Sequence, residues 1–184
     1  MHLLITLLLA HLLADFPLQS NGLARLKQSS LRGVFIHVLI YMGVTAFLLQ
    51  QPLRYWPLVL GLGVAHFVID AVKIVCKSHR AILCFVIDQS MHVSTVVAAV
   101  FWAQKVWQPT PRGVLSDHLL VPAFVCSLLL ATMVFCWVWT NDLSEEQLKR
   151  YFLLRWVKSE ILLLEQRVGL VLIGIVLLGQ FVIK

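Results

Sequence analysis

The chain has 184 residues, of which 60% are hydrophobic and only 13% are charged, and its mean hydropathy is +0.87. Soluble domains carry about 25% charged residues, so this composition excludes an ordinary soluble protein and indicates a membrane protein. In a membrane protein, the formal net charge of +6 reflects the topology and the contact of basic residues with anionic headgroups. It does not indicate nucleic acid as a partner.

Apolar stretches long enough to cross a bilayer, roughly 17–25 residues, occur repeatedly. We expect an all-α, polytopic transmembrane helical bundle of about six spans, at 2–18, 33–50, 57–76, 82–104, 118–139 and 167–183. The third stretch ends in mixed sequence and the sixth is short, so five spans is the alternative. No internal repeat or long linker divides the chain, and we treat residues 1–184 as a single transmembrane domain.

The first apolar stretch has a second interpretation, a cleaved signal peptide. A signal peptide needs a basic first segment and a small-residue cleavage site. Met1 and His2 supply no fixed positive side chain, and no A-x-A site follows the leucine run. We therefore interpret this stretch as a span.

Residues 144–165 differ from the six stretches because charged side chains alternate with aromatic and aliphatic ones. Ser144 followed by Gln147 fits a capping box, which satisfies free amides at a helix start. We expect an amphipathic helix in the cytoplasmic interface. Its role is either that of a connector or that of a lid that guides lipid.

The basic residues indicate the orientation of the bundle. Eleven of the 15 lie in the connections after the first span, after the third and before the sixth: Arg25, Lys27, Arg32, Lys73, Lys77, Arg80, Lys149, Arg150, Arg155, Lys158 and Arg167. The other four are Arg54, Lys105, Arg112 and Lys184. Because cytoplasmic loops carry the excess of basic residues, we expect both termini to be periplasmic.

The four cysteines form no C-x-x-C pair. Cys126 and Cys136 lie inside an expected span, where a free cysteine behaves as a small apolar residue. We expect no disulfide and no thiolate metal site.

Three histidine–aspartate pairs interrupt the apolar stretches at one spacing. HLLAD, HFVID and DQSMH each place a histidine and an aspartate four residues apart, and such residues lie on one helix face about one turn from each other. In the expected topology all three pairs, and His37 near the start of the second span, fall in the cytoplasmic half of the membrane. The seven candidate metal ligands are His11, Asp15, His37, His66, Asp70, Asp88 and His92.

Two interpretations of these pairs remain open. Charged groups inside spans are costly, roughly 2.5–3.5 kcal/mol for an aspartate at the bilayer centre, so the aspartates should face the bundle interior and have partners. The partners are either one another, in a polar network that fixes helix packing or relays protons, or a divalent metal ion. Imidazole and carboxylate together suit zinc, iron or manganese better than calcium, and helical bundles do build such sites.

Several neighbouring residues are candidates for supporting roles. Lys73 follows Asp70 by three residues, so it can neutralise that carboxylate or bind an anionic substrate, and we count it with Asp15, Asp70 and Asp88 as a candidate catalytic group. Lys27 is a second candidate for attracting an anionic headgroup. Gln19, Tyr41 and Gln89 are candidates for orienting ligands, the simpler interpretation being that they are ordinary boundary residues.

The same segments resemble a known pattern. HLLADFPLQ, then Lys27, HVLIY, HFVIDAVK and FVIDQSMH occur in the order seen in the domain-of-unknown-function 3307 family of bacterial membrane proteins, over about residues 7–100. The resemblance implies a small polytopic protein of the bacterial inner membrane and supplies no activity. A looser similarity, limited to spans with histidine and aspartate, is to small membrane proteins proposed as metal-dependent hydrolases.

Three function classes follow. We favour a metal-dependent hydrolase that opens to the cytoplasm and acts on a lipid or another membrane-associated anionic substrate, with metal-activated water as nucleophile. A metal-ion or proton transporter is the alternative, although transporter sites usually lie near the midplane within repeated halves. The third is a non-catalytic membrane subunit whose polar network only sets helix packing. The oligomeric state is left open.

Overall fold

The computed structural model describes residues 1–75 and 80–182, with side chains up to residue 179 in the last helix. The described residues form eight α-helices and no strand: α1 His2–Asp15, α2 Asn21–Ser29, α3 Leu31–Leu48, α4 Trp56–Val75, α5 Ala81–Val106, α6 Asp117–Asn141, α7 Glu145–Arg150 and α8 Phe152–Val182. The expected ends of the third and sixth spans, at 76 and 183, lie outside the described residues, as do Cys76 and Lys77.

The expected all-α membrane bundle is confirmed, with a difference in its first span. Five helices, α3, α4, α5, α6 and α8, are long and apolar enough to cross a membrane. Helix α1 is apolar but has only 14 residues, which at 1.5 Å per residue gives about 21 Å, less than the ~30 Å of a bilayer core. It ends at Asp15 because Pro17 follows, and a residue before proline is disfavoured in helical geometry.

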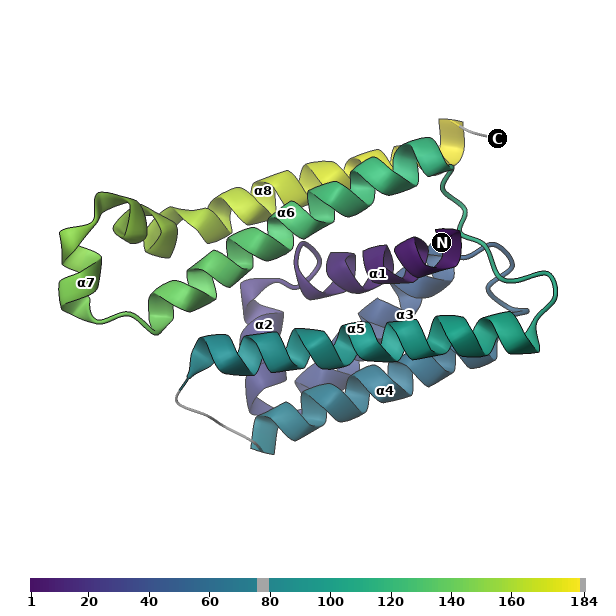
Figure 1. Ribbon diagram of the computed structural model, residues 1–184, viewed down its shortest axis with the longest axis horizontal. Helices are drawn as coiled ribbons and strands as arrows, with labels where there is room; N and C mark the ends of the chain where they lie inside the picture. The colour runs from purple at the N-terminus through teal and green to yellow at the C-terminus, as the bar shows by residue number, and fades with distance from the viewer. Residues whose placement is uncertain (76–79, 183–184) are drawn as a thin grey trace.

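Helix α1 occupies the centre of the bundle. Figure 1 shows α6 and α8 side by side along one side of it and α3, α4 and α5 on the other. Leu7, Leu9 and Ala10 of α1 are fully buried, and a helix that is apolar on all sides is typical of such a surrounded position. The N-terminus and the end of α8 lie at one end of the molecule, and α2 and α7 lie at the opposite end (Figure 1).

Helix α2, which the sequence did not predict, is held against α3 by a shared residue and a glycine. Ser30 ends α2 and caps α3, its Oγ accepting a hydrogen bond of 3.1 Å from the Gly33 amide. A Cβ on Gly33 would lie 2.3 Å from the backbone carbon of Leu26 in α2. Only glycine allows this approach, which places Lys27 against the bundle interior.

The region expected to form an interfacial helix over 144–165 is divided differently. The capping box of Ser144 and Gln147 is present, but the helix that it starts, α7, ends at Arg150. Residues from Phe152 onward continue without interruption into the last span as α8, 31 residues long. At about 46 Å, α8 exceeds the thickness of a bilayer core, so its charged first half is an extension of the span and not a separate helix.

Candidate metal centre

The three predicted pairs and His37 meet at one place in the bundle interior. They occupy the last turns of α1, the second turn of α3, the second half of α4 and the first half of α5, and all are buried. The set comprises His11, Asp15, His37, His66, Asp70, Asp88 and His92, and we call it the His/Asp cluster. The structure thus brings together all seven predicted ligands.

One part of the cluster joins two ring nitrogens to two carboxylate oxygens. His37 Nε2 lies 2.9 Å from Asp15 Oδ1 and 3.0 Å from His66 Nε2. His66 Nε2 also lies 3.4 Å from Asp15 Oδ1 and 3.3 Å from Asp70 Oδ2. A neutral imidazole carries one N–H and a carboxylate carries none, so these four atoms share at most two protons. A group so poor in donors fits a bound cation.

The adjoining part contains buried polar atoms that lack hydrogen-bond partners. Within the described ranges, none of Asp70 Oδ1, Asp88 Oδ1 and His92 Nε2 makes a hydrogen bond. His92 Nε2 lies 3.6 Å from Asp70 Oδ1 and 3.7 Å from Asp88 Oδ1, beyond hydrogen-bond distance. A buried polar atom left unpaired costs about 1–3 kcal/mol, and these three atoms could together hold a cation.

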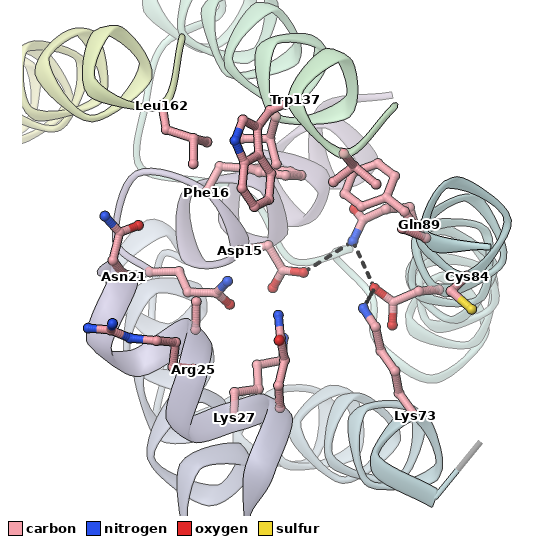
Figure 2. A pocket seen from close by; sticks show the side chains of 18 of the residues that line it. Asp15, Phe16, Asn21, Arg25, Lys27, Lys73, Cys84, Gln89, Trp137 and Leu162 are labelled. Carbon is pink, nitrogen blue, oxygen red and sulfur yellow. Dashed lines mark hydrogen bonds and ion pairs between the residues drawn. The ribbon is translucent and has the colours of Figure 1, made fainter. Parts of the chain in front are cut away.

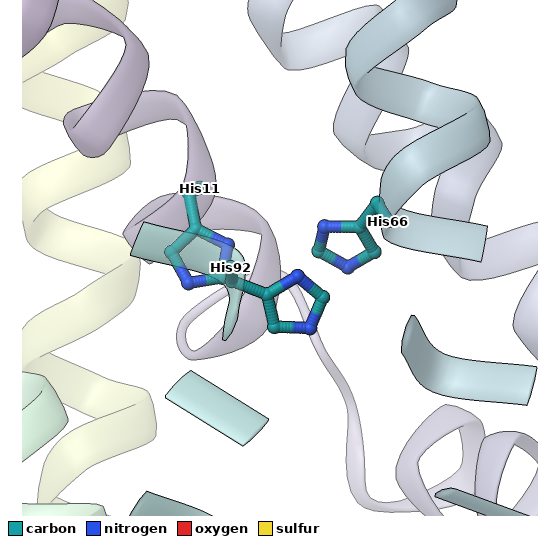
Figure 3. A group of neighbouring side chains, drawn as sticks. All are labelled: His11, His66 and His92. Atoms are coloured by element: carbon teal, nitrogen blue, oxygen red, sulfur yellow. The ribbon is translucent and has the colours of Figure 1, made fainter. Parts of the chain in front are cut away.

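Three of the histidine rings are packed together, as Figure 3 shows for His11, His66 and His92. The His66 and His92 rings stack with centroids 4.0 Å apart, and the His11 and His92 centroids are 4.9 Å apart. Tyr41 stacks on His66 at 4.5 Å. Tyr41 therefore contacts the cluster through ring packing against the His66 imidazole.

Two lysines neutralise two of the three aspartates, in a pairing that the sequence did not predict. Lys73 Nζ lies 2.7 Å from Asp88 Oδ2 and not beside Asp70, its neighbour on α4. Asp70 Oδ2 instead lies 2.8 Å from the buried Nζ of Lys27. Burial opposes the charged form of Lys27, but the carboxylates of Asp15 and Asp70 outweigh it and raise the pKa of Lys27 above its ordinary value.

The predicted glutamines lie at the edge of the cluster. Gln89 links three of its members: its Oε1 lies 3.2 Å from His11 Nε2, and its Nε2 donates to Asp15 Oδ2 and to Asp88 Oδ2 at 3.3 Å. Gln19 does not contact the cluster through a hydrogen bond, and its buried Oε1 has no partner in the described part of the chain. Gln89 therefore has the predicted orienting contacts, whereas Gln19 lines the cavity described next.

A cavity of about 920 Å³ opens beside the cluster, between α1, α2, α4, α5, α6 and α8. Figure 2 shows its two kinds of wall. Lys27 and Lys73 lie on one side of Asp15, while Phe16, Trp137 and Leu162 lie on the other. A cavity with one polar and one apolar wall suits an amphiphilic molecule whose head faces the cluster.

One further carboxylate lines this cavity and was missed by the sequence analysis. Glu165 of α8 is buried, and its Oε1 has no hydrogen-bond partner among the described residues. It falls at the end of the interfacial helix expected over 144–165, where charged side chains alternate with aromatic and aliphatic ones. A signal was nevertheless present, since Glu165 directly follows the aliphatic run Ile161 to Leu164.

The donor set fits a transition metal. Three groups of described residues each bring one ligand atom per residue within 4.8 Å of the others: His11, His66 and His92; Asp15, His37 and His66; and Asp70, Asp88 and His92. The groups are connected through His66 and His92, and each combines imidazole with carboxylate or contains imidazole alone. Such nitrogen and oxygen donors suit zinc, manganese or iron.

Comparison with known proteins gives a family and nothing closer. A family model described as "Protein of unknown function (DUF3307)" matches residues 3–121. The match includes all seven residues of the His/Asp cluster as well as Lys27 and Lys73. No curated protein and no solved structure matches the chain.

Proposed function

The chain belongs to the DUF3307 family, and we propose that it is an intramembrane metal-dependent hydrolase that acts on a lipid or another membrane-associated anionic substrate. The observation that carries this proposal is the position of the His/Asp cluster at the polar wall of an amphiphile-sized cavity. Metal ligands alone are compatible with storage or packing. Ligands beside a cavity that has two lysines on its polar wall and apolar side chains opposite provide both a reactive centre and a place for a substrate.

The charges of the cluster support a bound cation and an anionic substrate. With neutral histidines, the carboxylates of Asp15, Asp70 and Asp88 exceed the ammonium groups of Lys27 and Lys73 by one negative charge. One divalent ion reverses this balance to a net positive charge. A metal-loaded site of this kind attracts an anionic headgroup, and Lys73, whose side chain is 39% exposed, is the lysine with access to it.

Each group then has a definable role. A divalent metal polarises a phosphoryl or acyl oxygen and lowers the pKa of bound water. Asp15, Asp70 and Asp88 would hold the ion or act as general base, and Lys73 would stabilise negative charge on the substrate. Gln89 keeps Asp15 and Asp88 in place through its two hydrogen bonds.

The alternative function, a metal-ion or proton transporter, needs a path on the other side of the cluster. Three of the helices carry one cluster histidine each with buried apolar residues beside it. These residues lie four and eight positions from the histidine, toward the end of the bundle that holds the N-terminus. They are Leu7 and Leu3 on α1, Leu62 and Leu58 on α4, and Val96 and Val100 on α5. This packed apolar layer favours a site with one entrance, which suits an enzyme.

The site and several basic residues lie at the same end of the bundle, since α2, the last turn of α4 and the start of α5 carry part of the basic excess. By the rule that places such residues in the cytoplasm, the entrance faces the cytoplasm and the termini the periplasm. The family resemblance adds the bacterial inner membrane as the location. Membrane lipids are the expected partners.

Activity with and without metal tests this proposal. The chelator-stripped protein, in mixed micelles, receives Zn²⁺, Mn²⁺ or Fe²⁺ together with a fluorogenic phosphate ester or acyl ester that carries a long alkyl chain. We expect hydrolysis that requires one of these metals, falls at least 100-fold in His92→Ala and is unchanged in His118→Ala, a histidine outside the cluster. Metal-independent hydrolysis, or none of either ester with any metal, contradicts the proposal.

A further inference from the structure

We propose that the His/Asp cluster binds two metal ions, bridged by the two carboxylate oxygens of Asp70. The inference rests on the metal binding in the proposed function, but not on hydrolysis. It names a division of labour among the ligands that the sequence spacing does not contain. In this division Asp15 and His66 join His37 and one oxygen of Asp70, Asp88 and His92 join the other oxygen of Asp70, and His11 belongs to neither set.

The distances between ligand atoms decide whether a set of atoms can share one metal ion. Nitrogen and oxygen ligands lie about 2.0–2.2 Å from zinc, so two ligands of one ion that subtend 90–109° are about 3.0–3.5 Å apart. A set of atoms with such mutual distances can share one ion without rearrangement of the helices. Atoms that are further apart need either a shift or a second ion.

Four distances within the first set meet this criterion, and a fifth needs a shift of about 0.4 Å. It comprises Asp15 Oδ1, His37 Nε2, His66 Nε2 and Asp70 Oδ2. Asp15 Oδ1 lies 2.9 Å from His37 Nε2 and 3.4 Å from His66 Nε2. The two ring nitrogens are 3.0 Å apart, and His66 Nε2 lies 3.3 Å from Asp70 Oδ2. The distance from His37 to Asp70 is 3.9 Å. Two imidazoles and two carboxylates at these separations suit one four-coordinate ion.

The second set uses the other oxygen of Asp70. His92 Nε2 lies 3.6 Å from Asp70 Oδ1 and 3.7 Å from Asp88 Oδ1, so a movement of a few tenths of an ångström brings all three to one ion. None of the three atoms has a hydrogen-bond partner in the described ranges. The second ion therefore displaces no existing hydrogen bond.

Asp70 is the only residue common to the two sets. Its Oδ2 belongs to the first and its Oδ1 to the second. A carboxylate that donates one oxygen to each of two ions places them at the ~3.5–4 Å separation of two-metal hydrolytic sites. The ammonium of Lys27, 2.8 Å from Oδ2, is compatible with this arrangement because a carboxylate oxygen has two lone pairs.

The remaining histidine, His11, lies outside both sets. Its Nδ1 is 3.9 Å from Asp15 Oδ1, and its Nε2 faces Gln89 Oε1. We assign it a positioning role, in which it packs against the His66 and His92 rings.

Titration with Mn²⁺ tests the two-ion centre without reference to any substrate. The apo protein in detergent is loaded with Mn²⁺, freed of excess metal, and examined by elemental analysis and by electron paramagnetic resonance. We expect two ions per wild-type chain with the broadened signal of a coupled pair. His37→Ala, which removes a ligand of the first set, and His92→Ala, which removes one of the second, should each keep one ion with an uncoupled six-line signal. Asp70→Asn should lose the coupling, and His118→Ala should behave as wild type.

Folding is monitored by thermal melting in the absence of metal. His37→Gln and His92→Gln replace any alanine variant that melts more than 10 °C below the wild type.

The outcomes separate this inference from the proposed function. One ion per wild-type chain, or two ions without coupling, overturns the bridged pair but leaves a metal-dependent hydrolase intact. No bound ion overturns both. A coupled pair in a protein that hydrolyses neither test ester supports the two-ion centre and contradicts the hydrolase.

Discussion

Lys27 and Asp70 form a buried ion pair, Nζ to Oδ2 2.8 Å, that ties the short helix α2 to the centre of α4. Both side chains are nine-tenths or more buried. The pair connects a helix outside the apolar spans to the residue that we propose as the bridge of the metal centre. Its removal therefore affects stability and the site together, and the two effects can be measured separately.

Stability is measured first, in the presence of a chelator so that metal does not contribute. Removing one partner of a buried pair leaves an uncompensated charge and costs about 3–5 kcal/mol. We expect Lys27→Met and Asp70→Asn each to lower the free energy of unfolding by that amount. The double variant should be more stable than the sum of the two losses predicts, by about 1–3 kcal/mol of coupling. If the losses of the two single variants simply add in the double variant, the result contradicts an ion pair between Lys27 and Asp70.

The difference in unfolding free energy between wild type and Lys27→Met depends on pH with a definite sign. The pKa of Lys27 is raised in the folded protein, so its ion pair contributes fully below the ordinary lysine pKa of about 10.4. The contribution is lost only as the pH rises through the higher folded value. The difference in unfolding free energy between wild type and Lys27→Met should therefore be constant from pH 7 to 9. A decline within that range indicates that Lys27 is not charged as described.

The partners of the lysines show where sequence reasoning ends. The spacing of four within each His/Asp pair determines a common helix face, so the meeting of His11, His66 and His92 could be predicted from periodicity and expected depth. The partner of a long side chain depends on which helices are neighbours. Asp70 and Lys73 are close in sequence, but α5 presents Asp88 to Lys73 and α2 presents Lys27 to Asp70.

Gly33 is predicted to control the position of Lys27. A Cβ at this position meets the backbone of Leu26 and Lys27 at 2.3–2.5 Å, and backbone atoms cannot yield as a flexible side chain can. Gly33→Ala should lower the free energy of unfolding by about 1–3 kcal/mol, typical of overpacking. Gly43→Ala, where nothing lies within 4 Å of the added Cβ, is the matched control on the same helix. Equal effects of the two substitutions contradict the close approach of α2.

The entrance of the cavity can be located with a native thiol. Cys84 lines the cavity, and a variant with Cys76, Cys126 and Cys136 replaced by serine retains it alone. We expect membrane-impermeant maleimide to label Cys84 in inside-out vesicles and not in right-side-out ones. Gln108→Cys, on the exposed loop at the opposite end and in a background without the four native cysteines, should show the reverse. Labelling of Cys84 from the periplasmic face contradicts the predicted orientation.

The apolar wall of the cavity is predicted to hold the alkyl part of the substrate. Val138 of α6 lines this wall, and Val138→Trp narrows it. If the proposed activity is present, KM for a long-chain ester should rise about 10-fold, while kcat/KM for a short-chain ester with the same head should change less than twofold. Val125→Trp, on the outer surface of α6 at an exposed position, serves as control. Equal effects on both esters contradict an alkyl site.

The last two helices show a second limit of the sequence analysis. Charged side chains at Arg155, Lys158 and Glu160 suggested an interfacial helix that stops before the final span. Nothing in the chain between 152 and 182 breaks a helix, because this segment contains no proline, and its Gly169 packs against Pro17 of the turn after α1. The helix therefore continues, and it places Glu165 at the cavity.

The central claim, that the His/Asp cluster is a metal centre, is tested most directly by the metal content of the protein purified without chelator. Elemental analysis should find at least one zinc, manganese or iron ion per wild-type chain. His66→Ala, which removes a ring nitrogen 3.0–3.4 Å from three other candidate ligands, should lose most of this metal, and His118→Ala should retain it. A wild-type protein that is folded by its melting curve and contains no stoichiometric transition metal contradicts the account and leaves a packing network of histidines and aspartates in its place.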